Sequence, residues 1–237
     1  MIVELLYPSV SALYGERGNI DYLKLAFKDA TFIETEMNDI PYFVHNKVDF
    51  IFMGPTTERF QKIIIDKLLP YRLQLKTLID TNCFFLITGN ALEIFGSYII
   101  DDNGNTIDAL DIFSFYSKQD LMHRFNSYVL ATYNSIEMLG FKSQFTMVYP
   151  LQDLPIWMEM IRGIGLNKDI PVEGIKSNNF YGTHCLGPFL ILNPIFTLEL
   201  FKQLGYKAEK LPFEDDLMAA YTQRIEEFKD EKNINYQ

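Results

Sequence analysis

The sequence predicts an α/β fold with a mostly parallel central sheet and helices on both faces. Short and nearly continuous apolar runs, such as 50–53 and 83–87, alternate along the chain with helical patterns. Strands that are apolar on both sides are typical of a parallel sheet covered by helices on each face. The chain has 237 residues, 48% of them hydrophobic. It shows no low-complexity linker, so we expect one domain over 1–237.

The first part of the chain is predicted to alternate strands and helices. Strands are expected at Ile2–Leu6, 31–35, 50–53 and 83–87, and helices at 20–27, through 63–65 toward Leu69, and at 73–80. Asn19 is expected to cap the first helix, and Thr56 or Thr57 the second, because short polar side chains satisfy the first free backbone amides. Pro70 is expected to interrupt the second helix, since proline lacks an amide hydrogen.

The second part is predicted to be richer in β-structure before it returns to helix. The segment Asp102-Asn103-Gly104-Asn105 is a hairpin-turn signal, and 125–149 contains few helix formers. Helix is expected again after Pro194. The terminal helix over 213–229 is expected to place on one side the apolar residues Leu217, Ala220, Tyr221, Ile225 and Phe228. The polar tail after Lys229 is expected to fray.

Composition excludes several classes of function. A net charge of −10 argues against nonspecific binding to nucleic acid or anionic membrane, because both need a basic surface. The two cysteines favour a reducing compartment, the start at Met1 resembles a strand more than a signal peptide, and no apolar run is long enough to span a bilayer. We therefore expect a cytoplasmic protein.

No cofactor or metal site is predicted from the motifs. The histidines, His45, His123 and His184, are too scattered to indicate a metal site. The segment Gly163-Ile164-Gly165 opens like a dinucleotide-binding loop, but Lys168 stands where its third glycine belongs.

The most informative segment is 84–96, which has the outline of a nucleophile elbow. An apolar strand over 84–88 runs into a turn at Gly89-Asn90 and then into a predicted helix. This geometry exposes one side chain at the apex of the turn. The apex residue here is Gly89, which has no side chain that could act as a nucleophile.

Besides the elbow, the chain contains in order Leu13-Tyr14-Gly15-Glu16-Arg17-Gly18-Asn19, the turn at 53–60, the hairpin and strand over 102–116, Arg124, and Gly182-Thr183-His184-Cys185-Leu186-Gly187-Pro188 with Asn193-Pro194. These motifs, which extend over most of the chain, resemble those of the class I glutamine amidotransferases. The chain is most similar to the GatD-like glutaminase subunit of lipid II isoglutaminyl synthase and to the amidotransferase domain of cobyric acid synthases. The resemblance implies a flavodoxin-like class I glutamine amidotransferase fold.

The same alignment of motifs implies that the catalytic pair of the family is missing. The cysteine of the family falls on Gly89, its histidine on Leu186 and its glutamine on Glu93. Hydrolysis of glutamine by this family needs a thiolate and an imidazole. Gly89 has no thiol and Leu186 has no imidazole. If a glutamine pocket remains, we expect it among the residues Gly54, Pro55, Gly89, Asn90, Glu93, Arg124 and His184.

The resemblance implies a binding or regulatory subunit that contacts a Mur-ligase-like or other synthetase protein. One alternative is an active amidotransferase in which Thr88 or Cys185 acts with His184. A strand is expected to continue to Leu186, which would place His184 and Leu186 on one face and Cys185 on the other. Cys83 lies in an apolar run and is interpreted as a buried structural thiol. A second alternative is a sensor that binds an amino acid in the former glutamine pocket.

Overall fold

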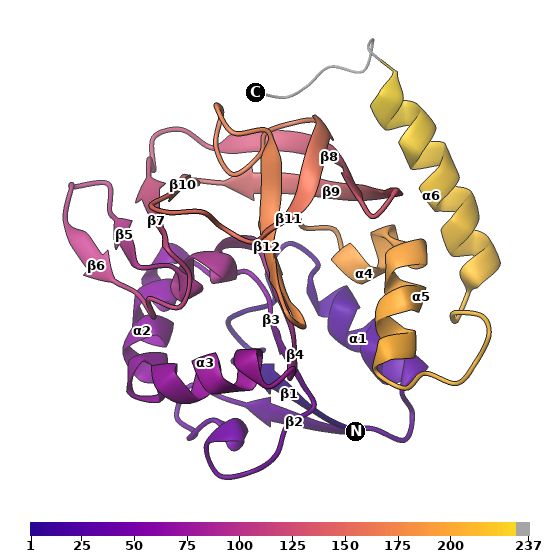
Figure 1. Cartoon of the computed structure of the whole chain (residues 1–237), viewed down its shortest axis with the longest axis horizontal. Helices are drawn as coiled ribbons and strands as arrows, with labels where there is room; N and C mark the ends of the chain where they lie inside the picture. Colours follow the sequence, from indigo (N-terminus) through magenta and orange to yellow (C-terminus); the bar gives the residue numbers. More distant parts are fainter. Residues whose placement is uncertain (231–237) are drawn as a thin grey trace.

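The computed structural model describes residues 1–230, and the predicted fraying of 231–237 lies outside the described residues. Its centre is a twisted nine-stranded sheet with the order β2-β1-β3-β4-β13-β12-β11-β8-β9 (Figure 1). A smaller sheet with the order β10-β7-β5-β6 packs beside it. The predicted α/β fold with a mostly parallel sheet is confirmed.

One half of the large sheet is entirely parallel. Its strands are β2 (Thr31–Thr35), β1 (Ile2–Leu6), β3 (Phe50–Met53), β4 (Phe84–Thr88) and β13 (Phe180–Thr183). Each is hydrogen-bonded to its neighbour in parallel register. Because the carboxyl ends of these strands meet at one edge, the loops that follow them are brought together there. The elbow after β4 is one of these loops.

The other half adds antiparallel strands. They are β12 (Val172–Ser177), β11 (Ile156–Arg162), β8 (Phe125–Tyr133) and β9 (Ile136–Gln144), of which β12 and β8 run against all the others. The small sheet comprises β10 (Thr146–Pro150), β7 (Phe115–Gln119), β5 (Tyr98–Ile100) and β6 (Thr106–Asp108). The turn at 102–105 joins β5 to β6 as an antiparallel hairpin, as predicted.

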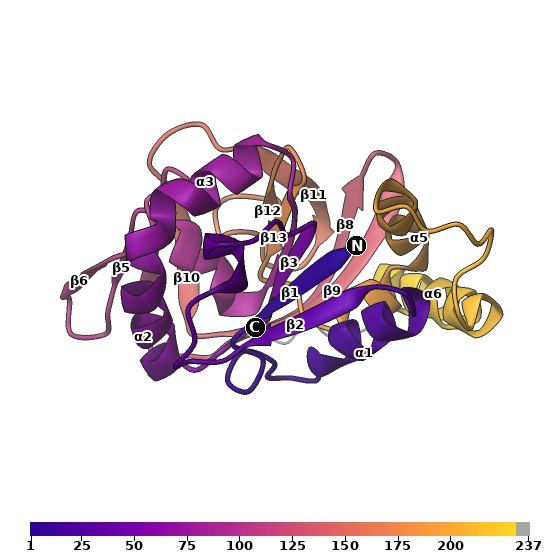
Figure 2. The same cartoon turned by 90° about the horizontal axis from the view of Figure 1, so that it is seen from below.

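Helices cover both faces of the parallel half (Figure 2). One face carries α1 (Arg17–Ala26), α4 (Phe189–Leu192), α5 (Pro194–Gln203) and α6 (Glu214–Lys229), and the other carries η1 (Tyr42–Val44), α2 (Glu58–Leu68), η2 (Leu69–Tyr71) and α3 (Arg72–Asp80). Alternation along β3 divides the core: Phe50 and Phe52 join the cluster with α1 and α5, whereas Ile51 and Met53 join the cluster with α2 and α3.

Two predicted helix starts had different outcomes. Thr57 caps α2 by accepting a hydrogen bond from the Phe60 amide at 3.3 Å, and Pro70 breaks the helix into α2, η2 and α3, as predicted. The cap at Asn19 was wrong. Glu16 stands at the N-cap of α1, and the Asn19 side chain is buried inside the helix, where it accepts a hydrogen bond from the Leu190 amide at 2.8 Å.

Two further elements differ from the sequence prediction. The segment after β4 is the 3₁₀ helix η3 (Gly89–Phe95) rather than an α-helix. The strand that was expected to continue to Leu186 ends at Thr183, and Leu186 instead forms an isolated antiparallel bridge with Phe141 of β9. This bridge turns the end of β13 toward the antiparallel half of the sheet.

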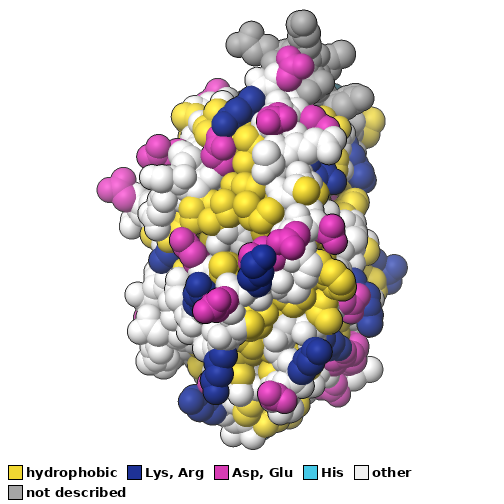
Figure 3. Space-filling view, turned by 90° about the vertical axis from the view of Figure 1, so that its right-hand side faces the viewer, with side chains coloured by type: hydrophobic (Ala, Val, Ile, Leu, Met, Phe, Trp, Pro, Cys, Tyr) yellow, Lys and Arg dark blue, Asp and Glu magenta, His cyan; other side chains and the backbone are white. Residues whose placement is uncertain are grey.

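The terminal helix α6 lies along the outside of α4, α5 and β8–β9. Its contact with the body uses Leu217, Met218, Tyr221, Ile225 and Phe228, whereas Ala220, which was expected on this side, is exposed. On this side of the molecule, hydrophobic side chains lie in strips between charged ones (Figure 3). Within residues 1–230 no helix is both long and apolar enough to cross a bilayer.

Candidate functional site

The elbow after β4 keeps the backbone geometry of an apex but has no room for a side chain there. Gly89 is buried and has a positive φ of 63°, a conformation that glycine adopts without steric cost. A Cβ at this position would lie 2.5 Å from Cβ of Pro55 and 3.0 Å from Cδ2 of Leu186. Those two side chains therefore occupy the space that an apex side chain would need.

A small pocket lies in front of this apex, with a volume of about 20 Å³. It is lined by Tyr14, Pro55, Thr56, Glu58, Gly89, Asn90, Ser143, Gln144, Phe145, His184 and Leu186. A volume of this size holds about one water molecule. Among the residues that the sequence suggested for a glutamine pocket, Pro55, Gly89, Asn90 and His184 line it.

The other three suggested residues lie outside the pocket lining. Gly54 is buried behind it, and its amide donates to the Ser11 carbonyl at 3.1 Å. Glu93 belongs to η3, and its side chain is fully buried. Arg124 is exposed at the rim, where its guanidinium lies 4.5 Å from the centre of the Phe145 ring.

Asn90 holds the turn after β3 against the elbow. Its side-chain oxygen accepts a hydrogen bond from the Thr56 amide at 2.9 Å, and its side-chain nitrogen donates to the Thr56 carbonyl at 2.9 Å. Gln61 of α2 donates to the Asn90 carbonyl at 2.8 Å and to Oε2 of Glu93 at 2.9 Å. The segment after the apex is therefore held against the turn after β3 and against α2 by paired hydrogen bonds.

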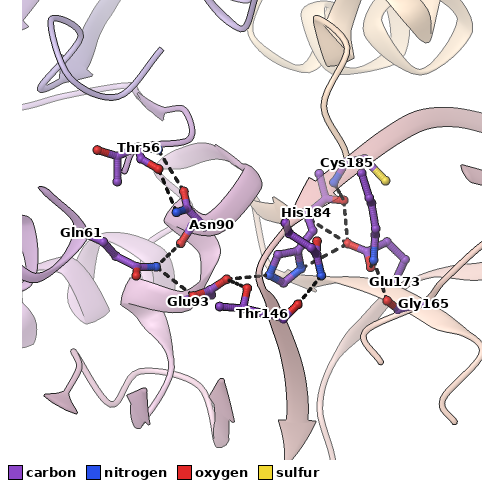
Figure 4. Close-up of polar contacts among 12 residues, drawn as sticks. Thr56, Gln61, Asn90, Glu93, Thr146, Gly165, Glu173, His184 and Cys185 are labelled. Carbon is purple, nitrogen blue, oxygen red and sulfur yellow. Dashed lines mark hydrogen bonds and ion pairs between the residues drawn. The ribbon is translucent and has the colours of Figure 1, made fainter. Parts of the chain in front are cut away.

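His184 lies between two buried carboxylates (Figure 4). Its Nε2 is 3.4 Å from Oε1 of Glu93, and its Nδ1 is 3.7 Å from Oε1 of Glu173. Glu173 also accepts hydrogen bonds from the His184 amide at 2.8 Å and from the Thr183 hydroxyl at 2.9 Å. Glu93 accepts a further hydrogen bond from the Thr146 hydroxyl.

Lys142 of β9 completes this buried ionic network. Its ammonium group contacts Oε2 of Glu173 and donates to the Gly165 carbonyl at 2.6 Å. Lys142 and Glu173 therefore form a buried pair of opposite charges. Buried charges cost much free energy unless they are paired in this way.

The pKa values in the network follow from this pairing. Burial alone would raise the pKa of Glu173, but Lys142 and His184 hold that pKa well below its ordinary value. Burial alone would lower the pKa of His184, but contacts with Glu173 and Glu93 outweigh it and raise the pKa. Both ring nitrogens of His184 therefore face carboxylate oxygens.

Thr88 and Glu16 form a second buried polar cluster behind the apex. The Thr88 hydroxyl donates to Oε2 of Glu16 at 2.7 Å, and the Gly187 amide donates to Oε1 at 2.6 Å. Burial raises the pKa of Glu16 to about 7 despite these hydrogen bonds and one from Asn19. Thr88 faces Glu16 and does not line the pocket in front of Gly89.

Both cysteines are buried and lie outside the apex pocket. Burial raises the pKa of Cys83 and of Cys185 to about 12. Cys185 packs against Gly140 of β9, whereas its neighbours His184 and Leu186 face the pocket. Neither thiol is therefore ionised near neutral pH.

Sequence reasoning missed Gln61, Lys142, Thr146 and Glu173, which support the site. A signal for two of them was present. Lys142 follows Gly140-Phe141, and Glu173 stands between Val172 and Gly174-Ile175, so each charge interrupts an apolar strand pattern. A charged residue at such a position requires a buried partner, although the pattern does not say which one.

The fold and the chain length match known amidotransferases. GatD, a subunit of the glutamine-hydrolysing lipid II isoglutaminyl synthase, is 24% identical in Streptococcus pneumoniae over 238 residues, covering 96% of this chain and 90% of that protein. GatD of Staphylococcus aureus is 24% identical over 204 residues, covering 85% and 83%. No protein-family profile matches the chain.

Two crystal structures share the fold. One glutamine amidotransferase superimposes with a TM-score of 0.59 and 10% identity over 86% of this chain and 100% of that one. A glutamine amidotransferase from Thermotoga maritima superimposes with a TM-score of 0.52 and 7% identity over 95% and 92%. The chain is thus similar in sequence to GatD and shares the fold of glutamine amidotransferases.

Proposed function

We propose that this chain is a cytoplasmic amidotransferase-like subunit that does not hydrolyse glutamine and that binds a synthetase protein of the Mur-ligase type. The main support for the proposed absence of hydrolysis is the apex, where Pro55 and Leu186 fill the space beside Gly89. A pocket of about 20 Å³ leaves no room for a glutamine side chain. Loss of both catalytic partners removes most of the rate of a reaction in which the two act as a unit.

The geometry disfavours a relocated nucleophile. The Thr88 hydroxyl is directed at Glu16, and the Cys185 thiol, with a pKa raised to about 12, is packed away from the pocket. His184, the base that either nucleophile would need, is engaged by two carboxylates. An amino-acid sensor at the same place would require Pro55 and Leu186 to move apart.

Purified protein should release no glutamate from glutamine and should gain no mass from a glutamine-like diazoketone. A GatD relative that keeps the cysteine and histidine serves as the positive control. Stoichiometric labelling that maps to Thr88, Cys83 or Cys185 would overturn the loss of hydrolysis. Glutamine that binds without reacting, measured by calorimetry, would favour the sensor.

The partner is expected to dock on the rim of the apex pocket. This apex rim comprises Tyr14, Leu121, Met122, Arg124 and Phe145, with 47% of Tyr14 and 82% of Met122 exposed. The Asp120 amide donates to the Phe145 carbonyl at 2.7 Å, which ties the 120–124 loop to the pocket. Exposed apolar side chains next to an arginine are typical of the centre of a protein interface.

Co-purification from the native cell tests this role. The wild-type chain and Leu73→Asp, which places a charge at an exposed apolar position outside the rim, should recover one synthetase-type protein in equal amount. Met122→Asp should reduce that recovery at least tenfold. Recovery of the wild-type chain without a partner, or equal recovery with Met122→Asp, would contradict the proposed role.

A further inference from the structure

A second pocket lies far along the chain from the elbow motif, in the loop that joins β11 to β12. We call it the loop pocket; its volume is about 390 Å³, and it is lined by Phe125, Gly163, Ile164, Gly165, Asn167, Lys168, Asp169, Ile170 and Pro171. This volume is within the range of small-molecule sites, which are mostly apolar with a few polar groups. The apex pocket, at about 20 Å³, is far smaller.

The loop that forms this pocket is held in one conformation. The buried Asn167 side chain donates to the Val148 carbonyl at 2.7 Å and accepts from the amides of Asp169 at 2.9 Å and Ile170 at 3.1 Å. Gly163 has a φ of 102°, and a Cβ there would clash with the Tyr128 carbonyl oxygen. The pocket is therefore preorganised, which lowers the entropic cost of binding a ligand.

Two opposite charges stand at the pocket without being paired. Lys168 and Asp169 are both exposed, and neither makes an ion pair within the described residues 1–230. The Lys168 ammonium lies 5.1 Å from the centre of the Phe125 ring, so the cation sits above an aromatic wall. Ile164, Ile170 and Pro171 supply the other apolar surfaces.

The loop pocket also touches the buried ionic network. The carbonyl of Gly165, a lining residue, accepts the hydrogen bond from Lys142, whose ammonium contacts Glu173 beside His184 (Figure 4). A ligand that shifts the Gly165 peptide therefore changes the position of Lys142. The change can be detected at the His184 imidazole because Glu173 contacts both Lys142 and His184.

We propose that the loop pocket binds a small zwitterion with an apolar body, such as an apolar amino acid. Its carboxylate pairs with Lys168, its ammonium group pairs with Asp169, and its side chain packs between Phe125, Ile164 and Ile170. This site is separate from the former catalytic apex, so it does not depend on whether the chain hydrolyses glutamine.

Titration of the full chain with L-phenylalanine, followed by ¹H–¹⁵N NMR, tests the site. Saturable shifts are expected at the amides of Gly163, Gly165 and Lys168, with a smaller shift at the His184 imidazole. Lys168→Ala should weaken phenylalanine binding about tenfold, because a charge-assisted contact is lost. Lys76→Ala, at an exposed lysine of α3, is the matched control and should leave binding unchanged.

A second probe separates the two charges. N-acetyl-L-phenylalanine keeps the carboxylate but has no ammonium group, so Asp169→Asn should weaken phenylalanine binding and leave the binding of the acetylated probe unchanged or stronger. The proposal is overturned if neither probe gives saturable shifts in the loop up to its solubility limit. It is equally overturned if Lys168→Ala binds phenylalanine as the wild type does.

Discussion

Gly89 combines a positive φ with a crowded environment, and the two effects can be measured separately. Gly89→Ala must adopt a φ of 63° and also place a methyl group against Pro55 and Leu186. Gly104→Ala has a similar φ of 82° but meets nothing within 4 Å, so it is the matched control. The left-handed conformation costs about 1–2 kcal/mol for alanine, and overpacking adds about 1–3 kcal/mol.

We therefore expect Gly89→Ala to lose about 1–3 kcal/mol more free energy of unfolding than Gly104→Ala in urea denaturation. For the same steric reason, Gly89→Cys with Leu186→His should show no glutaminase activity. Equal losses for the two alanine variants would show that the apex has room for a side chain. Measurable turnover by the double variant would show the same.

Glu16 should make the stability of the protein depend on pH. Its pKa rises from an ordinary 4.5 to about 7 because the carboxyl group is buried. Between these two pH values the folded state holds a proton that the unfolded state has released, so the free energy of unfolding falls as pH rises, by about 3 kcal/mol in total.

Urea titrations from pH 4.5 to pH 8 check this dependence. In Glu16→Gln the fall between pH 4.5 and pH 6.5 should be smaller than in the wild type, and the part that remains comes from Glu4, whose pKa is also raised by burial. A fall above the ordinary His pKa should remain, because the raised pKa of His184 gives stability that is lost as pH rises through it. A wild-type profile that is flat or rising between pH 4.5 and pH 7 would contradict the assignment to Glu16.

At the scale of elements, Lys142 joins β9 to β12 and to the loop that follows β11. Lys142→Met leaves Glu173 with less compensation, and removal of one partner of a buried pair costs about 3–5 kcal/mol. Lys24→Met, which breaks an exposed pair with Glu34, should cost about 1 kcal/mol or less. Denaturation midpoints measure both losses.

Adding Glu173→Gln to Lys142→Met should restore part of the lost stability, because the uncompensated charge is removed. The free energy of unfolding lost by the double variant is compared with the sum of the losses of the two single variants. A loss equal to that sum would show that the two side chains act independently. Equal effects of Lys142→Met and Lys24→Met would contradict the buried pairing.

Local signals were sufficient for most elements of the fold. The strands β1, β2 and β3 coincide with their predicted ranges. The helix α2 begins after the predicted cap Thr57, and it is interrupted at Pro70 as predicted. The cap at Asn19 failed because Leu190, 171 residues away, takes its side-chain oxygen. Such competition from a distant segment has no local pattern.

The candidate site was predictable only in part, for the same reason. The turn at Gly89-Asn90 and the side chain of His184 could be placed from the order of motifs. The filling of the apex by Pro55 and Leu186, and the pairing of Glu173 with Lys142, depend on residues that meet only through the sheet order. Sequence spacing indicates a charge inside a strand but not its partner.

At the scale of the whole molecule, a net charge of −10 should make stability depend on salt. Repulsion between like charges disfavours the compact state. Salt shortens the distance over which charges interact, because the Debye length is about 30 Å at ~0.01 M and about 8 Å at ~0.15 M. We expect the melting temperature to rise by a few degrees between these two NaCl concentrations. KCl at equal ionic strength is the control, and a melting temperature that falls with both salts would contradict the repulsion.

The contact between Pro55 and Gly89 also restricts the order in which substitutions can accumulate. A cysteine introduced at 89 meets the proline ring before any benefit of a thiol can appear, whereas a smaller residue at 55 first opens the space. Leu186 imposes the same condition on the other side. A sequence that acquired a nucleophile at 89 would therefore need smaller side chains at 55 and 186 first, because the two present there occupy the space.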